Sequence, residues 1–319
     1  MAPENSTWFA AGMMAAALAA GMVFYFFRLK KEGLPGITVL WTALLGVLLG
    51  LIASKAGYLV HDLGSNLFDG YFDEMLSLDP TTLSFVCGCA GMTAGAALAA
   101  KIGGIRTGKA LDLFAAPGCV MICLARVAEG WMDYIGLGNP VEAGWLKFFP
   151  LSRTNAWGDA YLNVFVLEAL TALVCLVPAL RRQTADRRDG AVFERTAVCL
   201  LGAQICWEML LQYPYIRAFV TSFVSLEQVW CAVLLLWIMI RGCIRGKRWW
   251  PLPAAAALLG ISAFFQFFRD NKISFVFEEG WEKILEHSGT IAIAAFVLVS
   301  AGLVFCGLKA VSPAKEKNS

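Results

Sequence analysis

Five side chains that can ionise or hydrogen-bond lie inside otherwise apolar stretches of this chain: Lys55, Arg126, Glu129, Glu208 and Gln228. A polar group is costly in hydrocarbon and is usually tolerated only where it faces other helices or a wet cavity. In the topology predicted below, these side chains fall at a similar depth, in the half facing away from the cytoplasm. We therefore expect one polar cavity, open to the outside, in which cations bind an anion and a carboxylate accepts a proton.

Each of these residues also has a purely structural interpretation. Arg126 and Glu129 are three residues apart, so they share a helix face and could simply pair with each other. Lys55 could form an ion pair with Glu129, Glu168 or Glu208. Gln204 lies one helical turn before Glu208, on the same face. The sequence leaves both interpretations open for every member of the set.

The elements that must position these residues are membrane helices. The chain has 319 residues, is 59% hydrophobic and only 16% charged, and has a mean hydropathy of +0.65. This composition is typical of a polytopic membrane protein and excludes an ordinary soluble domain. We predict an all-α integral membrane protein with about nine transmembrane helices. The apolar runs are 8–27, 37–60, 81–100, 110–128, 160–180, 192–212, 225–244, 252–268 and 288–308.

Charge sets the predicted orientation. If residue 1 lies outside, five connections share one side: 28–31, 101–109, 181–188, 241–248 and the tail from Lys309. These connections hold most of the Lys and Arg residues, which marks the cytoplasmic face. We therefore predict an outside N-terminus and a cytoplasmic C-terminus. The first run lacks a basic n-region, so we expect a retained helix rather than a signal peptide.

Charge and cysteine usage exclude several function classes. The net charge of +2 is mostly explained by topology and gives no indication of nucleic-acid binding. Most of the ten cysteines lie inside apolar runs, where Cys behaves as a small hydrophobe rather than as part of a disulfide framework. Cys119 and Cys123 share a helix face, but Cys87 and Cys89 point apart, so we expect no metal site. No cofactor-binding motif is present.

Two regions lie outside this helical pattern. The connection Trp131 to Asp159 is rich in Trp, Phe and Pro, and we expect it to lie on the membrane as an interfacial cap. The basic stretch Arg241 to Pro253 precedes the last two apolar runs and suggests a boundary near residue 246. We expect one membrane domain over residues 1–245 and two additional helices within residues 246–319.

Four segments carry a resemblance to a known family. Leu44–Tyr58 contains a lysine just before Gly-Tyr, and Leu111–Pro117 leads into Arg126. Gly202–Glu208 ends in a glutamate, and Ser225–Gln228 reads Ser-Leu-Glu-Gln. These segments resemble those of the prolipoprotein diacylglyceryl transferases, which move diacylglycerol from phosphatidylglycerol onto the lipobox cysteine thiol of secreted lipoprotein precursors. The resemblance covers roughly residues 40–240.

The chain also departs from the pattern of that family. Ser84–Gly91 has no histidine where the family has His-Gly-Gly, and Glu129 stands where the family has asparagine. Gln204 stands where the family has arginine. Seven spans are usual in the family, whereas this chain is predicted to have nine.

The resemblance implies roles for the polar set. Lys55 and Arg126 would hold a lipid phosphate, Glu129 or Glu208 would be the base in place of the missing histidine, and Gln204 and Gln228 would orient the headgroup. The implied partners are phosphatidylglycerol and a prolipoprotein lipobox peptide, and the implied location is a bacterial-type plasma membrane with the site facing the outer leaflet. The alternative is a divergent relative that binds phospholipid or a membrane partner without catalysis.

Overall fold

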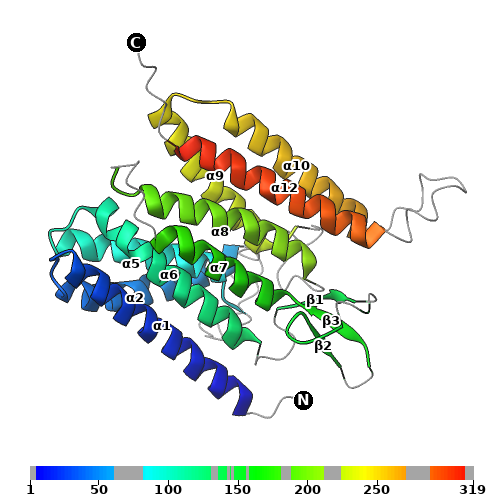
Figure 1. Cartoon of the computed structure of the whole chain (residues 1–319), viewed down its shortest axis with the longest axis horizontal. Helices are drawn as coiled ribbons and strands as arrows, with labels where there is room; N and C mark the ends of the chain where they lie inside the picture. Colours follow the sequence, from blue (N-terminus) through cyan, green and yellow to red (C-terminus); the bar gives the residue numbers. More distant parts are fainter. Residues whose placement is uncertain are drawn as a thin grey trace, which may run out of the picture. The chain divides into compact units, whose positions relative to one another are not determined.

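The structure of the chain is a computed structural model. It describes residues 5–60, 82–130, 136–141, 144, 147–155, 158–180, 188–211, 224–270 and 288–312. His61 and His287 lie outside these described residues, as do parts of the connection between residues 131 and 159. The described residues form two compact units. Their helices and strands are labelled in Figure 1.

Helices dominate both units. The helices of the first unit are α1 (Asn5–Lys31), α2 (Ile37–Leu59), α5 (Phe85–Ile102), α6 (Thr107–Glu129) and α7 (Val164–Leu180). Helix α8 (Ala191–Leu210) contributes residues up to 200 to the first unit and residues 201–210 to the second. The second unit continues with α9 (Leu226–Gly246), α10 (Pro251–Asp270) and α12 (Ser288–Val311).

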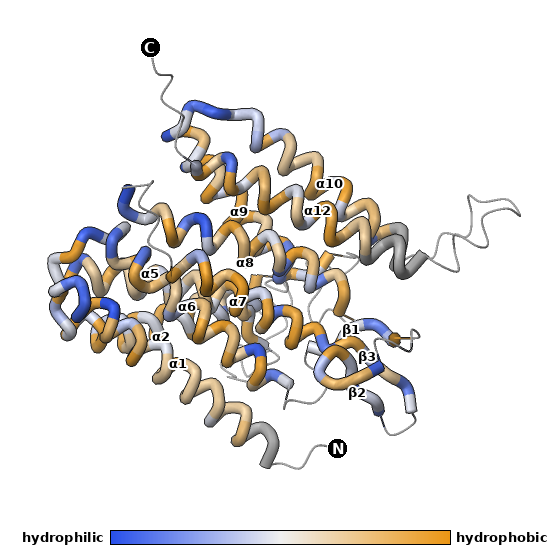
Figure 2. Tube along the Cα trace, viewed as in Figure 1, coloured by the Kyte–Doolittle hydropathy of each residue, from blue (hydrophilic) through white to orange (hydrophobic). Residues whose placement is uncertain are grey.

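All nine apolar runs predicted from the sequence coincide with a helix in the described residues. Six of these helices are long and apolar enough to cross a membrane: α1, α2, α5, α6, α9 and α12. This confirms a helical membrane protein. In Figure 2, hydrophobic colouring follows the helices, whereas hydrophilic colouring gathers at connections such as those between α1 and α2 and between α5 and α6. That α7, α8 and α10 also cross the membrane, and the orientation, stay predictions.

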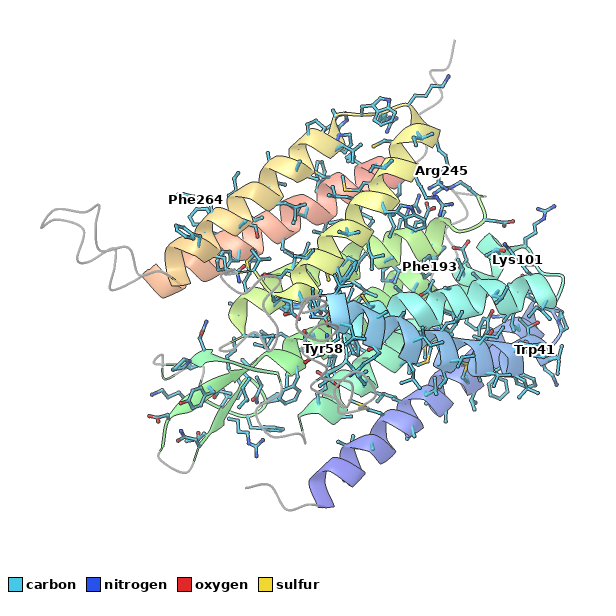
Figure 3. All side chains as sticks on the ribbon, turned by 180° about the vertical axis from the view of Figure 1, so that it is seen from behind. Trp41, Tyr58, Lys101, Phe193, Arg245 and Phe264 are labelled. Carbon is cyan, nitrogen blue, oxygen red and sulfur yellow. The ribbon has the colours of Figure 1, made fainter. Side chains whose placement is uncertain are left out.

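Glycines allow α2 and α5 to pack closely in the first unit. A Cβ atom at Gly95 would lie 2.5 Å from the backbone nitrogen of Gly46, and a Cβ at Gly91 would collide with the carbonyl of Leu49. Trp41, at the start of α2, and Lys101, at the end of α5, lie at one end of this pair, with Tyr58 at the other (Figure 3). The two helices are therefore antiparallel, which brings the end of α2 to the start of α5.

A buried aromatic cluster fixes α1 against α6. Tyr25 is fully buried and packs edge-on against Phe114 with ring centroids 5.3 Å apart. Met22 and Met121 belong to the same core, so apolar side chains hold the first unit together here. Helix α6 also packs along α7.

The structure adds a small antiparallel sheet that we did not predict from the sequence. Its strands are β1 (Leu137–Pro140), β2 (Ser152–Thr154) and β3 (Ala160–Asn163), in the order β1-β3-β2. The predicted apolar run 160–180 therefore begins as a strand and becomes helix α7 only at Val164. These strands are too short to give a clear alternating pattern of apolar and polar residues, which is why sequence periodicity missed them.

Helix α12 packs against both α9 and α10 in the second unit. A Cβ atom at Gly242 of α9 would lie 2.6 Å from the carbonyl oxygen of Ala310 on α12. Ser300 on α12 donates to the carbonyl of Gly202 at 2.6 Å. Helix α9 is grouped with the last two helices in this unit, and the domain boundary predicted near residue 246 stays a prediction.

Candidate functional site

The start of α5 is fastened to the end of α2 by side-chain and backbone hydrogen bonds. Ser84 is the N-cap of α5, and its hydroxyl accepts from the backbone N–H of Cys87 at 3.2 Å. The Ser54 hydroxyl donates to the Ser84 carbonyl at 2.6 Å, and the Ser84 N–H donates to the Ser54 carbonyl at 3.1 Å. Both serines are buried, so these bonds set the register of the two helices.

Lys55 follows Ser54 and contacts the same segment. Its Nζ donates to Thr82 Oγ1 at 3.0 Å and lies 5.1 Å from the centre of the Tyr58 ring. Figure 3 marks Tyr58 at this end of α2. The lysine therefore lies beside the residues that lead into α5.

Arg126 reaches the start of α5 from α6. Its Cζ is 3.8 Å from the centre of the Phe85 ring, and Phe85 is the first residue of α5. A guanidinium over an aromatic face at this distance gains cation–π attraction. Lys55 and Arg126, from two different helices, thus contact one four-residue segment, 82–85.

Two carboxylates engage Arg126. Its Nη1 donates to both Glu129 oxygens, at 3.0 and 2.8 Å, and its Nε lies 3.3 Å from Glu168 Oε2 on α7. The three side chains are each less than 10% exposed. Buried charges are expected to be paired in this way. We call Arg126, Glu129, Glu168 and Phe85 the arginine cluster.

Arg126 pairs with Glu129, which is one of the two interpretations that the sequence left open for this arginine. The structure adds Glu168 and Phe85, which the sequence analysis did not assign to the site. In the sequence, Glu168 is marked only as a carboxylate in an apolar run, and Phe85 only as an aromatic residue next to a serine that can cap a helix. Neither signal gives the distance between α5, α6 and α7.

A second polar cluster lies in the second unit around Glu208. Gln204 Nε2 donates to one carboxylate oxygen at 3.0 Å, and the Ser225 hydroxyl donates to the other at 3.1 Å. Ser225 and Gln228 form a capping box at the start of α9. The Gln228 side chain accepts from the Ser225 N–H at 2.9 Å and donates to the Ile205 carbonyl at 3.4 Å. We call Gln204, Glu208, Ser225 and Gln228 the glutamate cluster.

The predicted polar set is therefore found as two groups. Lys55, Arg126 and Glu129 converge on the start of α5 in the first unit, and Gln204, Glu208 and Gln228 come together in the second. Gln228 has a clear capping role that the resemblance did not suggest. The expectation of one shared cavity stays a prediction. In the part of the chain that is described, no three His, Cys, Asp or Glu side chains are arranged to hold a metal ion.

Asp112, in the segment that leads into Arg126, has a structural position. Its carboxylate accepts from the backbone N–H groups of Gly190 and Phe193, at 2.8 and 2.9 Å. These groups belong to the N-terminal end of α8, whose N-cap Gly190 has a φ of 92° and no side chain to offer. Asp112 on α6 therefore caps α8 from a distance, and its charge complements the helix dipole.

Chemically, the arginine cluster and Lys55 combine anion-binding groups with a possible base. A planar guanidinium suits a phosphate or carboxylate, and the ammonium of Lys55 supplies a second positive charge. The carboxylate of Glu129 lies directly beside the guanidinium. Comparison with models of known protein families finds no match, and comparison with curated proteins finds no relative.

Proposed function

We propose that this chain is a membrane transferase that moves diacylglyceryl from phosphatidylglycerol to the cysteine thiol of a prolipoprotein. The observation that carries the proposal is that two cations from different helices contact one short segment, Lys55 at Thr82 and Arg126 at Phe85. The resemblance to the diacylglyceryl transferases at the segments containing both cations supports it. The location proposed is a bacterial-type plasma membrane, with the site facing the outer leaflet as the distribution of basic residues suggests.

The phosphate of the donor lipid would be held by the two cations. Arg126 has a planar guanidinium with five N–H donors. Its Nη1 donates to Glu129, whereas its Nε lies 3.3 Å from Glu168 Oε2 without making a hydrogen bond. The N-terminal end of α5 adds a favourable dipole, because helix N-termini attract anions. Two cations, an aromatic face and a helix N-terminus together suit an anionic headgroup.

Glu129 would accept the proton of the attacking thiol. In the transfer, the thiol sulfur forms a bond to the glycerol carbon of the diacylglyceryl group, and the bond from that carbon to the phosphate oxygen breaks. Glycerophosphate leaves with the electron pair of the broken bond, and the thiol proton passes to the carboxylate. The contact between Arg126 and Glu129 supports this role, because a phosphate bound to Arg126 would lie beside the carboxylate.

The glutamate cluster contains the other carboxylate that the sequence marks as a base. Glu208 is buried and accepts from neutral donors, Gln204 and Ser225. Glu208→Gln and Glu129→Gln distinguish the two assignments, because only the variant lacking the base should lose turnover while it still binds phosphatidylglycerol.

A second candidate is a relative that binds phospholipid without catalysis. The observation that favours it is that two carboxylates already occupy the guanidinium of Arg126, so a phosphate would have to displace or share these contacts. In addition, Cys87-Gly88-Cys89 stands at the start of α5, where the family has a histidine. This candidate predicts phospholipid binding with no release of glycerophosphate.

Matched variants of two lysines test the proposal. Lys55→Ala should weaken phosphatidylglycerol binding and reduce glycerophosphate release in reconstituted protein. Lys101→Ala removes an exposed lysine at the opposite end of the α2–α5 pair and should change neither quantity. Equal behaviour of the two variants would contradict the proposed phosphate site.

A further inference from the structure

An exposed aromatic turn stands out in the connection between β1 and β2. Phe148 is 52% exposed and Phe149 is 80% exposed, and their neighbours Lys147 and Pro150 are exposed as well. We call residues 147–150 the Phe-Phe tip. Two adjacent exposed phenylalanines outside any helix leave apolar area uncovered, which is unfavourable in water.

Hydrogen bonds from the neighbouring strands β2 and β3 hold the backbone of the Phe-Phe tip. The Ser152 N–H donates to the Phe148 carbonyl at 2.9 Å, and the Asn163 side chain donates to the Pro150 carbonyl at 2.8 Å. The Asn163 N–H also donates to the Leu151 carbonyl at 2.8 Å, and Asn163 itself is only 1% exposed. A buried side chain thus fixes a turn whose aromatic rings point away from the core, which preorganises it for contact with a partner.

The same asparagine sets the level of the tip. Asn163 is the last residue of β3, and Val164, which follows it, is the first residue of the apolar helix α7. The tip is therefore hydrogen-bonded to the residue at which an apolar helix begins. For an α7 that crosses the membrane as predicted, this level is the boundary between water and hydrocarbon, where aromatic side chains concentrate in membrane proteins.

We propose that the Phe-Phe tip is seated in the interfacial region of the bilayer and contacts anionic lipids. Phe148 and Phe149 enter the boundary between headgroups and acyl chains. Lys147 and Arg153, both exposed and at either side of the aromatic pair, face lipid phosphates. The partner is thus a lipid surface carrying negative charge. This inference does not depend on the proposed transferase activity.

Photo-crosslinking of the full chain tests this contact. Phe149→p-benzoylphenylalanine keeps an aromatic ring at the exposed position, and Thr154→p-benzoylphenylalanine places the same probe at an exposed residue at the far end of β2. Both proteins are placed in nanodiscs of phosphatidylcholine with and without phosphatidylglycerol, irradiated, and analysed by mass spectrometry for lipid adducts.

The expected result is several-fold more lipid adduct at position 149 than at position 154, with phosphatidylglycerol over-represented among the adducts. Lys147→Gln combined with Arg153→Gln should abolish that over-representation while the adducts with phosphatidylcholine persist. Equal adduct yields at the two positions would overturn the proposal. Adducts with a second polypeptide chain in place of lipid would also overturn it, because they would make the tip a protein-binding surface.

Discussion

Removal of Arg126 should expose the energetic role of the arginine cluster. Arg126→Met keeps an apolar side chain beside Phe85 but leaves Glu129 and Glu168, which are 6% and 5% exposed, without the guanidinium that contacts both. Breaking a buried ion pair by removing one partner typically costs about 3–5 kcal/mol. We expect a loss of this size in the free energy of unfolding, measured by SDS titration of the protein in mixed micelles.

A triple variant separates two causes of this loss of stability: carboxylates left without a cation, and the loss of packing by the arginine side chain. The triple variant Arg126→Met, Glu129→Gln, Glu168→Gln removes the carboxylate charges together with the cation, and it should recover most of the stability. Arg106→Met serves as the matched control, because the Arg106 side chain is 87% exposed and its Nη1 lies 3.7 Å from Asp189 Oδ2. Its effect should be at most about 1 kcal/mol.

Two results would refute this reasoning. The first is an Arg126→Met variant whose stability differs from the parent by no more than the Arg106→Met control. The second is a triple variant that is no more stable than Arg126→Met alone, because the cost would then not arise from uncompensated carboxylates.

Three further variants and one control test other contacts by the same unfolding assay. Gly95→Ala should cost about 1–3 kcal/mol because its methyl group meets the backbone of α2, whereas Gly12→Ala, with open space around it, should be neutral or slightly stabilising; equal effects would contradict the close packing. Asp112→Ala should cost about 0.5–2 kcal/mol through the loss of the α8 cap, and an unchanged stability would show that the cap contributes nothing. Ser225→Ala removes a capping box and a donor to Glu208, and should cost about 1–2 kcal/mol; a neutral effect would count against the glutamate cluster as a structural unit.

The helices were the most predictable part of this protein. Long apolar runs need only their own backbone hydrogen bonds, so composition locates them without knowledge of tertiary contacts. A contact between Arg126 and Glu129 could also be foreseen, because residues three apart on a helix are neighbours. The hydrogen bond between Gln204 and Glu208 follows from the same local spacing.

The features that the sequence did not predict depend on contacts between segments far apart in the chain. Glu168 on α7 contacts Arg126 on α6. Asp112 caps a helix that begins 79 residues later along the chain, at Ala191. No local pattern encodes such a distance. The sheet was missed because its strands are three or four residues long and one includes Gly and Pro.

The most direct test of the proposed function is a single reaction with the purified protein. The protein is mixed with phosphatidylglycerol and a lipobox-containing precursor peptide, and the products are analysed by mass spectrometry. The proposal predicts a peptide that carries a diacylglyceryl thioether on its cysteine, together with released glycerophosphate. Unmodified peptide, from protein that still binds phosphatidylglycerol, would contradict the transferase and favour a lipid-binding relative.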